Sequence, residues 1–182
     1  SSVNTKTNAS KTKAKATEDA DTTEATRIKK EADELRTAAE ALDKDDLWQK
    51  AAGKLDMDKI SSAVRDFADN YNKVLDQASK VGSKEVSQDV SFMKGMTDTF
   101  SKVLGKAGIT VGEDGKLAVD EEALRKTDGS ILRSLFDGNA TYGSQIADKA
   151  NSIIRDADIS SAIYGSNATT TSALSSLYNQ LI

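Results

Sequence analysis

A sustained heptad pattern over residues 60–81 constrains the fold of this chain more than any other feature. Its apolar side chains recur at steps of four and three residues, which places them along one stripe of an α-helix. They are Ile60, Val64, Phe67, Tyr71, Val74, Ala78 and Val81. Such a stripe is stable only when it is buried, so we expect a helix from about Asp58 that packs against other helices.

The same spacing recurs in three other parts of the chain, and no proline interrupts any of them. Because proline is the strongest helix breaker, long helices are expected throughout. Gly82 and Ser83 supply a helix stop and a new N-cap, and a connection this short favours an antiparallel helix pair. The further stripes are Ile28, Ala32, Leu35, Ala39 and Leu42; Val86, Val90, Met93, Met96, Phe100 and Val103; and Tyr142, Ile146, Ala150, Ile153 and Ala157.

Apolar residues recur at every second position in residues 109–111 and 117–119, on either side of a segment bounded by Gly112 and Gly115. This pattern predicts a β-hairpin whose turn glycines adopt positive φ. Two strands alone are marginally stable in water, so the hairpin is expected to lie on a helix. Asp120 is placed to cap a short helix that follows the second strand.

These patterns predict a mainly α fold, an antiparallel, coiled-coil-like helical bundle with one small β-hairpin at about residues 109–119. Residues 1–24 contain almost no large apolar side chain beyond Val3, and we expect them to form a flexible polar tail. The bundle is expected to span residues 25–165. Residues 166–182, which contain Leu174, Leu177 and Leu181, are predicted to form a C-terminal amphipathic helix.

The composition argues against several classes of function. Histidine and cysteine are both absent, which removes most familiar catalytic and metal-binding groups. The net charge is −4, with acidic and basic residues interspersed, so no broad positive surface is expected to bind nucleic acid. No apolar run is long enough for membrane insertion. We therefore expect a protein that is not an enzyme and that has no cofactor, no metal and no small-molecule substrate.

Carboxylates are the remaining candidates for acid–base chemistry. Asp43, Asp45 and Asp46 form one group, and Glu121 and Glu122 form another. Both groups lie in polar segments with lysines, which predicts exposure to solvent. Because catalytic carboxyls need burial or a close charge partner to shift their pKa, we expect these groups to be ordinary solvated carboxylates.

Residues 114–121 resemble the second half of a calcium-binding loop, with an Asp-Gly pair followed by a glutamate. The first half does not fit, because Thr110 and Gly112 occupy the positions where carboxylates or amides should bind. Too few oxygen ligands remain for a tight site. A plain hairpin turn is the expected structure.

The C-terminal leucines, Leu174, Leu177 and Leu181, have two interpretations. They either complete the bundle or contact a protein partner, which is another copy of the chain or a different protein. We treat them as the candidate partner-binding residues.

Three segments together resemble the C-terminal region of the bacterial flagellar cap family, the hook-associated filament-capping proteins. They are VRDFADNYNKVLD at 64–76, AGITVGEDGKLAVDEEALRK at 107–126, and the Leu-Phe pair at 135–136. The order and spacing carry the resemblance, which covers about two fifths of the chain. Full members of the family also have large β-rich central domains and longer terminal coiled segments, so the chain fits a short paralogue or an excised fragment.

The resemblance implies a non-enzymatic assembly protein of a flagellated bacterium, exported without a cleaved signal. It implies an extracellular location, on the flagellum or cell surface, and other axial flagellar subunits as partners. A secreted or surface-associated, adhesin-like binding module that retains the scaffold without a filament role is the alternative.

Overall fold

We describe the protein from a computed structural model, which covers residues 4–159 and gives only the backbone for residues 4–22. Helices dominate, and the mainly α fold with one small hairpin is confirmed. The elements are α1 (Asn4–Leu42), the 3₁₀ helix η1 (Asp45–Trp48), α2 (Met57–Ala78), α3 (Lys84–Thr99), α4 (Ser101–Lys106), β1 (Ile109–Val111), β2 (Leu117–Val119), α5 (Glu121–Arg125), α6 (Gly129–Phe136) and a helix over residues 142–159.

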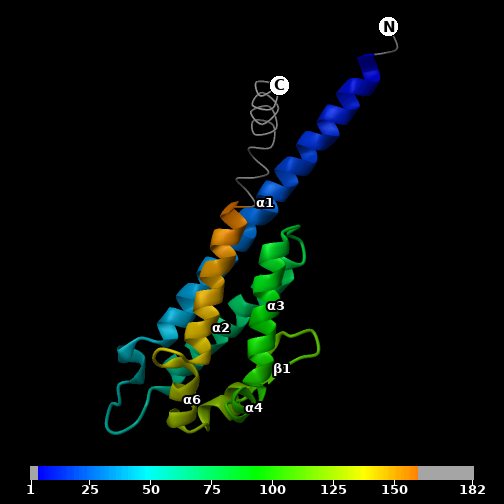
Figure 1. Ribbon diagram of the computed structural model, residues 1–182. Coiled ribbons are helices and arrows are strands. Elements are labelled where there is room, and N and C mark those ends of the chain that lie inside the picture. Colours follow the sequence, from blue (N-terminus) through cyan, green and yellow to red (C-terminus); the bar gives the residue numbers. More distant parts are fainter. Residues whose placement is uncertain (1–3, 160–182) are drawn as a thin grey trace, which may run out of the picture.

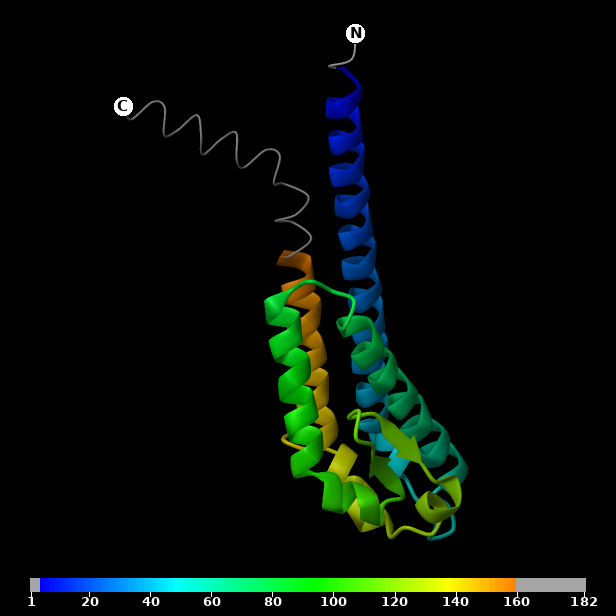
Figure 2. The ribbon, with the colours of Figure 1, turned by 90° about the vertical axis from the view of Figure 1, so that its right-hand side faces the viewer.

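The four long helices run along one axis and alternate in direction, as Figures 1 and 2 show. α1 packs mainly on α2, and helix 142–159 lies beside α3 in both views. The hairpin and the short helices gather at the end of the bundle opposite the N-terminal end of α1. The predicted antiparallel arrangement is therefore confirmed.

The predicted stripes form the core. Every stripe residue in α1, and every one in helix 142–159, is buried. In α2 the stripe is buried from Ile60 to Ala78, whereas Val81 follows the helix and is half-buried. Phe67 packs edge-on against Phe136 and Tyr142, with ring centroids 5.5 and 5.9 Å away. This aromatic cluster joins α2, α6 and helix 142–159.

α1 begins much earlier than expected. The sequence places the start of the ordered bundle at residue 25, but the helix is continuous from Asn4. No glycine precedes Gly53 and proline is absent, so nothing in the local sequence stops the helix. The apolar stripe marks where α1 packs, with Ala25 and Ile28 buried, rather than where the helix starts. Flexibility of residues 1–24 stays a prediction.

The third stripe is divided between two helices. α3 ends at Thr99, and Phe100 lies outside the helical region with φ −89° and ψ 3° before α4 begins. The Phe100 ring packs against Tyr142, with a centroid distance of 5.5 Å. The expected N-cap at Ser83 is confirmed, because its side chain accepts a hydrogen bond from the Val86 amide.

The hairpin has the predicted register and position. Ile109 pairs with Val119 and Val111 with Leu117, so the apolar residues share one face of the two strands. β1 lies on α4 and β2 on α2. Gly115 has the expected positive φ of 83°, but Gly112 does not, because the turn needs a left-handed residue only at its end. Gly108, which directly precedes β1, also has a left-handed backbone conformation, with φ 77°.

The single tryptophan of the chain anchors the connection after α1. Trp48 is 4% exposed, and its indole N–H donates a 2.8 Å hydrogen bond to the carbonyl of Leu42. This bond satisfies one of the carbonyls left free at the end of α1. The tryptophan therefore fixes the direction in which the chain leaves the helix.

Candidate interaction surface

The predicted partner-binding residues Leu174, Leu177 and Leu181 lie outside the described residues. Their assignment stays a prediction. In the part of the chain that the structure describes, no helix is long and apolar enough to cross a membrane.

The N-terminal half of α1 is the most distinctive surface feature. At about 1.5 Å per residue, this helix of 39 residues is about 58 Å long, whereas α2 has 22 residues and is about 33 Å long. The N-terminal part of α1, blue in Figures 1 and 2, extends beyond the ends of α2, α3 and helix 142–159. The bundle therefore presents a projecting helix at one end.

Two contacts mark where α1 joins the bundle. The side-chain amide of Gln77 in α2 donates to the backbone carbonyl of Glu24, at 3.3 Å, and also to its carboxylate. Lys29 forms an ion pair with Asp158, near the end of helix 142–159. We call residues 4–22 of α1 the projecting segment, because they precede both contacts.

Upstream of Ala25 the apolar stripe does not continue. The same four-and-three spacing leads to Asp21, Glu18, Ala14 and Lys11. Three of these four residues are charged and the fourth is alanine, so a helix gains little from hydrophobic burial along this stripe. A helix that packs on this part of α1 must therefore supply complementary charged and polar groups. Polar residues at heptad positions of coiled coils determine the choice of partner in the same way.

Two large apolar side chains are exposed in the part of the chain whose side chains are described. Phe92 of α3 is 53% exposed and Ile159 of helix 142–159 is 58% exposed. The Lys149 ammonium lies 4.2 Å from the centroid of the Phe92 ring, a cation–π contact. Phe92 and Ile159 therefore both add apolar area to the surface of the pair formed by α3 and helix 142–159.

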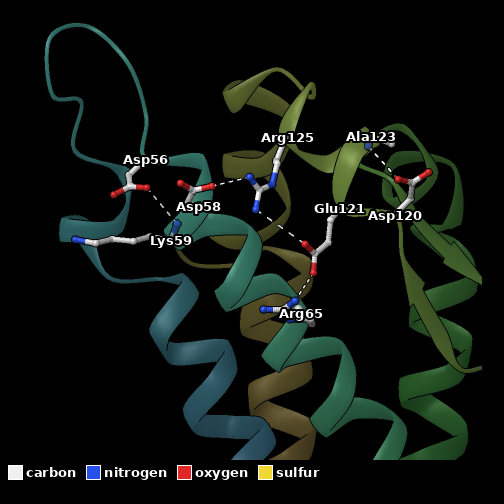
Figure 3. Close-up of polar contacts among 8 residues, drawn as sticks. All are labelled: Asp56, Asp58, Lys59, Arg65, Asp120, Glu121, Ala123 and Arg125. Atoms are coloured by element: carbon white, nitrogen blue, oxygen red, sulfur yellow. Dashed lines mark hydrogen bonds and ion pairs between the residues drawn. The ribbon is translucent and has the colours of Figure 1, made fainter.

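An ion-pair network at the opposite end of the bundle attaches α5 to α2 (Figure 3). Glu121 forms an ion pair with Arg65, and Arg125 pairs with Asp58 at 2.7 Å. Asp120 accepts a hydrogen bond from the Ala123 amide, which confirms the predicted cap. The four paired side chains are 38–80% exposed, so the network positions α5 with a small energetic contribution.

The carboxylates weighed for chemistry make structural contacts. Asp43 accepts a hydrogen bond from the Gly138 amide, and Glu122 pairs with Lys126 at 3.0 Å within α5. Asp45 and Asp46 form the first turn of η1. The structure does not bring the two groups together, because Glu121 and Glu122 lie on α5 and the three aspartates follow α1.

The segment that resembles a calcium loop is a tight turn. The Asp114 carboxylate accepts a hydrogen bond from the Lys116 amide at 3.0 Å, and the Gly112 amide donates to the Lys116 carbonyl at 2.8 Å. Across the described residues, no cluster of three or more carboxylates has the arrangement of a metal site.

Asn72 has a role that the sequence did not reveal. Its side-chain amide donates to the Leu117 carbonyl at 2.9 Å and accepts from the Leu117 amide at 2.8 Å. The Asn72 side chain therefore makes the pair of backbone hydrogen bonds that a neighbouring strand would make, and it joins α2 to β2. The Asn lies next to Tyr71 in the motif that resembles the flagellar family, but only the tertiary structure shows its partner.

The chain was compared with models of known protein families, with curated proteins and with solved structures, and it matches none of them.

Proposed function

We propose that the chain is a non-enzymatic structural module that assembles with partner proteins by packing helices against them. The projecting segment of α1 is the observation that supports this proposal most strongly. A helical segment of this length that extends beyond its neighbouring helices is marginal in water, because most helical stability in proteins comes from tertiary packing. A partner helix would supply that packing.

The position of the projecting segment adds a second argument. The last described turn of helix 142–159 lies near Lys29, toward the end of the bundle from which the projecting segment extends. Leu174, Leu177 and Leu181 follow this turn in the sequence. The charged and polar residues of the projecting segment would provide specificity for the partner. The leucines would bury apolar area, which is worth about 25 cal/mol per Å² before ordering costs. Together they would form a two-part contact with a partner.

The resemblance to the flagellar cap family supports axial flagellar subunits as the proposed class of partner. Its three segments lie on α2, on the hairpin with α5, and on α6. In the proposed role, this scaffold holds the terminal helices in place while they contact axial subunits of a flagellum or a second copy of the chain. The location would be extracellular.

Cosedimentation with isolated flagellar filaments that retain their hooks tests this role. We expect the intact chain to pellet with the filaments, and a chain that begins at Thr23 to remain largely in the supernatant. The shortened chain keeps the Glu24–Gln77 contact and the whole buried stripe, so its bundle should stay folded.

Two other results would redirect the proposal. Binding to cell surfaces stripped of flagella, without binding to filaments, would favour the adhesin-like alternative. Equal pelleting of the intact and shortened chains with filaments would show that the projecting segment is not the contact.

A further inference from the structure

α3 and helix 142–159 form an antiparallel pair whose register is fixed by contacts along its length. Thr97 is hydrogen-bonded to Tyr142 at one end, with 2.8 Å between the hydroxyl oxygens. Lys149 lies over the Phe92 ring in the middle. At the other end Asp89 of α3 meets Asp156 of helix 142–159, so two carboxyl groups face each other across the interface.

The geometry at Asp89 lacks a hydrogen-bond donor. Its Oδ2 atom is buried and has no hydrogen-bond partner, although the residue as a whole is half-buried. Ionised carboxylates only accept hydrogen bonds, so Asp156 cannot satisfy this oxygen while both groups are charged. A proton on either carboxyl creates the missing donor, and the two groups can then share one hydrogen bond.

The charged groups around Asp89 do not remove the need for a proton on one of the two carboxyls. Lys149 and Arg155, both on helix 142–159, favour the charged form of Asp89, but burial and the neighbouring Asp156 oppose them more strongly. From α1, Lys29 pairs with Asp158. On α3, Glu85 accepts a hydrogen bond from the Ser83 hydroxyl. The net result is that burial, followed by Asp156, raises the pKa of Asp89 to about 7.

We infer that Asp89 and Asp156 form a proton-dependent contact that holds the last turns of helix 142–159 against α3 and weakens when the shared proton is lost. The contact lies in the last described turn of helix 142–159, so it controls how firmly this turn packs on α3. This inference concerns the isolated chain and does not depend on the proposed function.

The direction of the pH dependence follows from linkage. The folded chain holds a proton on this pair at pH values where an unfolded aspartate, with a pKa near 3.9, has lost it. The stabilising contribution is therefore fully present below about pH 4. It decreases as the pH rises through about 7, the raised pKa of Asp89.

Carbon-13 NMR titration of the side-chain carboxyls in the intact protein tests the proton directly. We expect the Asp89 carboxyl to show a titration midpoint near 7, well above that of an ordinary aspartate. A midpoint near 4 for Asp89 would overturn the inference. This measurement needs no variant, so it remains decisive even if a substitution prevents folding.

Asp89→Asn tests the consequence, because the amide mimics the protonated carboxyl in shape and as a donor. We expect its Tm to exceed that of the wild type by about 2–4 °C at pH 8.5, with a smaller excess at pH 5.5 and little difference at pH 4. Asp148→Asn is the matched control, because it makes the same charge change at an exposed position on helix 142–159. Equal shifts in the two variants would contradict the inference.

Hydrogen exchange localises the effect. After correction for intrinsic exchange rates, amides of residues 150–159 in the wild type should lose protection between pH 6 and pH 8.5, whereas those of Asp89→Asn should not. Uniform loss of protection across α1, α2 and helix 142–159, in both proteins alike, would show that the pair does not act locally.

Discussion

Tyr71 of α2 and Tyr142 of helix 142–159 are joined through a single hydroxyl group, that of Thr97 in α3. Each phenol oxygen lies 2.8 Å from Thr97 Oγ1, and all three side chains are fully buried. A threonine hydroxyl can donate one hydrogen bond and accept another, so it can satisfy both tyrosines. Burial raises the pKa of both phenols, that of Tyr71 to about 12, so both remain protonated at neutral pH.

Thr97→Val should therefore destabilise the bundle although it preserves the size of the side chain. It leaves two buried hydroxyls without their shared partner, at a cost of about 1–3 kcal/mol in the free energy of unfolding. Urea denaturation followed by circular dichroism measures this loss. Thr97→Ser keeps the hydroxyl and is the control. A valine variant as stable as the serine variant would show that the hydroxyl chain contributes nothing.

Asn72→Ala should release the hairpin from α2. The substitution removes both hydrogen bonds to the Leu117 backbone, and we expect a loss of about 1–3 kcal/mol together with faster hydrogen exchange of the Leu117 amide. Asn70→Ala is the matched control, because the Asn70 amide is exposed and bonds only within its own helix, to the Asp66 carbonyl. Equal effects at the two positions would contradict the proposed role of Asn72.

Gly108→Ala should destabilise the junction between α4 and β1. Gly108 has φ 77°, and an added Cβ would lie 2.8 Å from the Asp120 carbonyl oxygen and 2.9 Å from the Leu124 amide nitrogen. Both neighbours are backbone atoms that cannot move cheaply, so the cost should exceed the roughly 1–2 kcal/mol of left-handed strain alone. Thermal unfolding measures the change in Tm.

Gly95→Ala is the opposite case and serves as the control for this substitution. Gly95 lies within α3, and an added Cβ would meet no atom within 4 Å. Alanine there should stabilise the protein by about 0.5–1 kcal/mol. A destabilised Gly95→Ala variant would mean that the surroundings of α3 are more crowded than described.

Glu121→Gln should have a small effect that depends on salt. Glu121 contacts both Arg65 and Arg125, but these groups are largely exposed, so the expected loss is about 1 kcal/mol or less. The loss should shrink in high salt, which screens exposed charges. Glu122→Gln, which affects only the pair with Lys126, is the comparison. A loss of several kcal/mol that salt does not change would contradict this account.

Periodicity and local signals were sufficient to predict the bundle, the hairpin and the caps. The heptad stripe of α2 indicated burial correctly, because apolar residues such as Phe67 and Val64 that recur on one helix face are stabilised by packing there. Asp120 acts on an amide three residues away, so its role can be read from local sequence. Exposure was predicted correctly for Asp43, Asp45, Asp46 and Glu122, since neighbouring lysines indicate a solvated surface, whereas Glu121 is half-buried.

Features that depend on packing or on distant contacts were not predicted. The start of α1 was missed because apolar spacing identifies the packed part of a helix, and residues 4–24 are helical without such a stripe. Asn72 and Leu117 lie 45 residues apart, and Asp89 and Asp156 meet only across a helix pair. No local pattern encodes either contact. The candidate contact leucines lie outside the described residues.

The solution mass of the chain tests the central claim, assembly through the ends of the terminal helices, most directly. Light scattering over a range of concentrations would compare the intact chain, a chain beginning at Thr23 and a chain ending at Gly165, each alone and mixed with purified hook-associated subunits. The account predicts complexes above the monomer mass that weaken with either truncation. A monomer under every condition, or complexes that neither truncation affects, would contradict it.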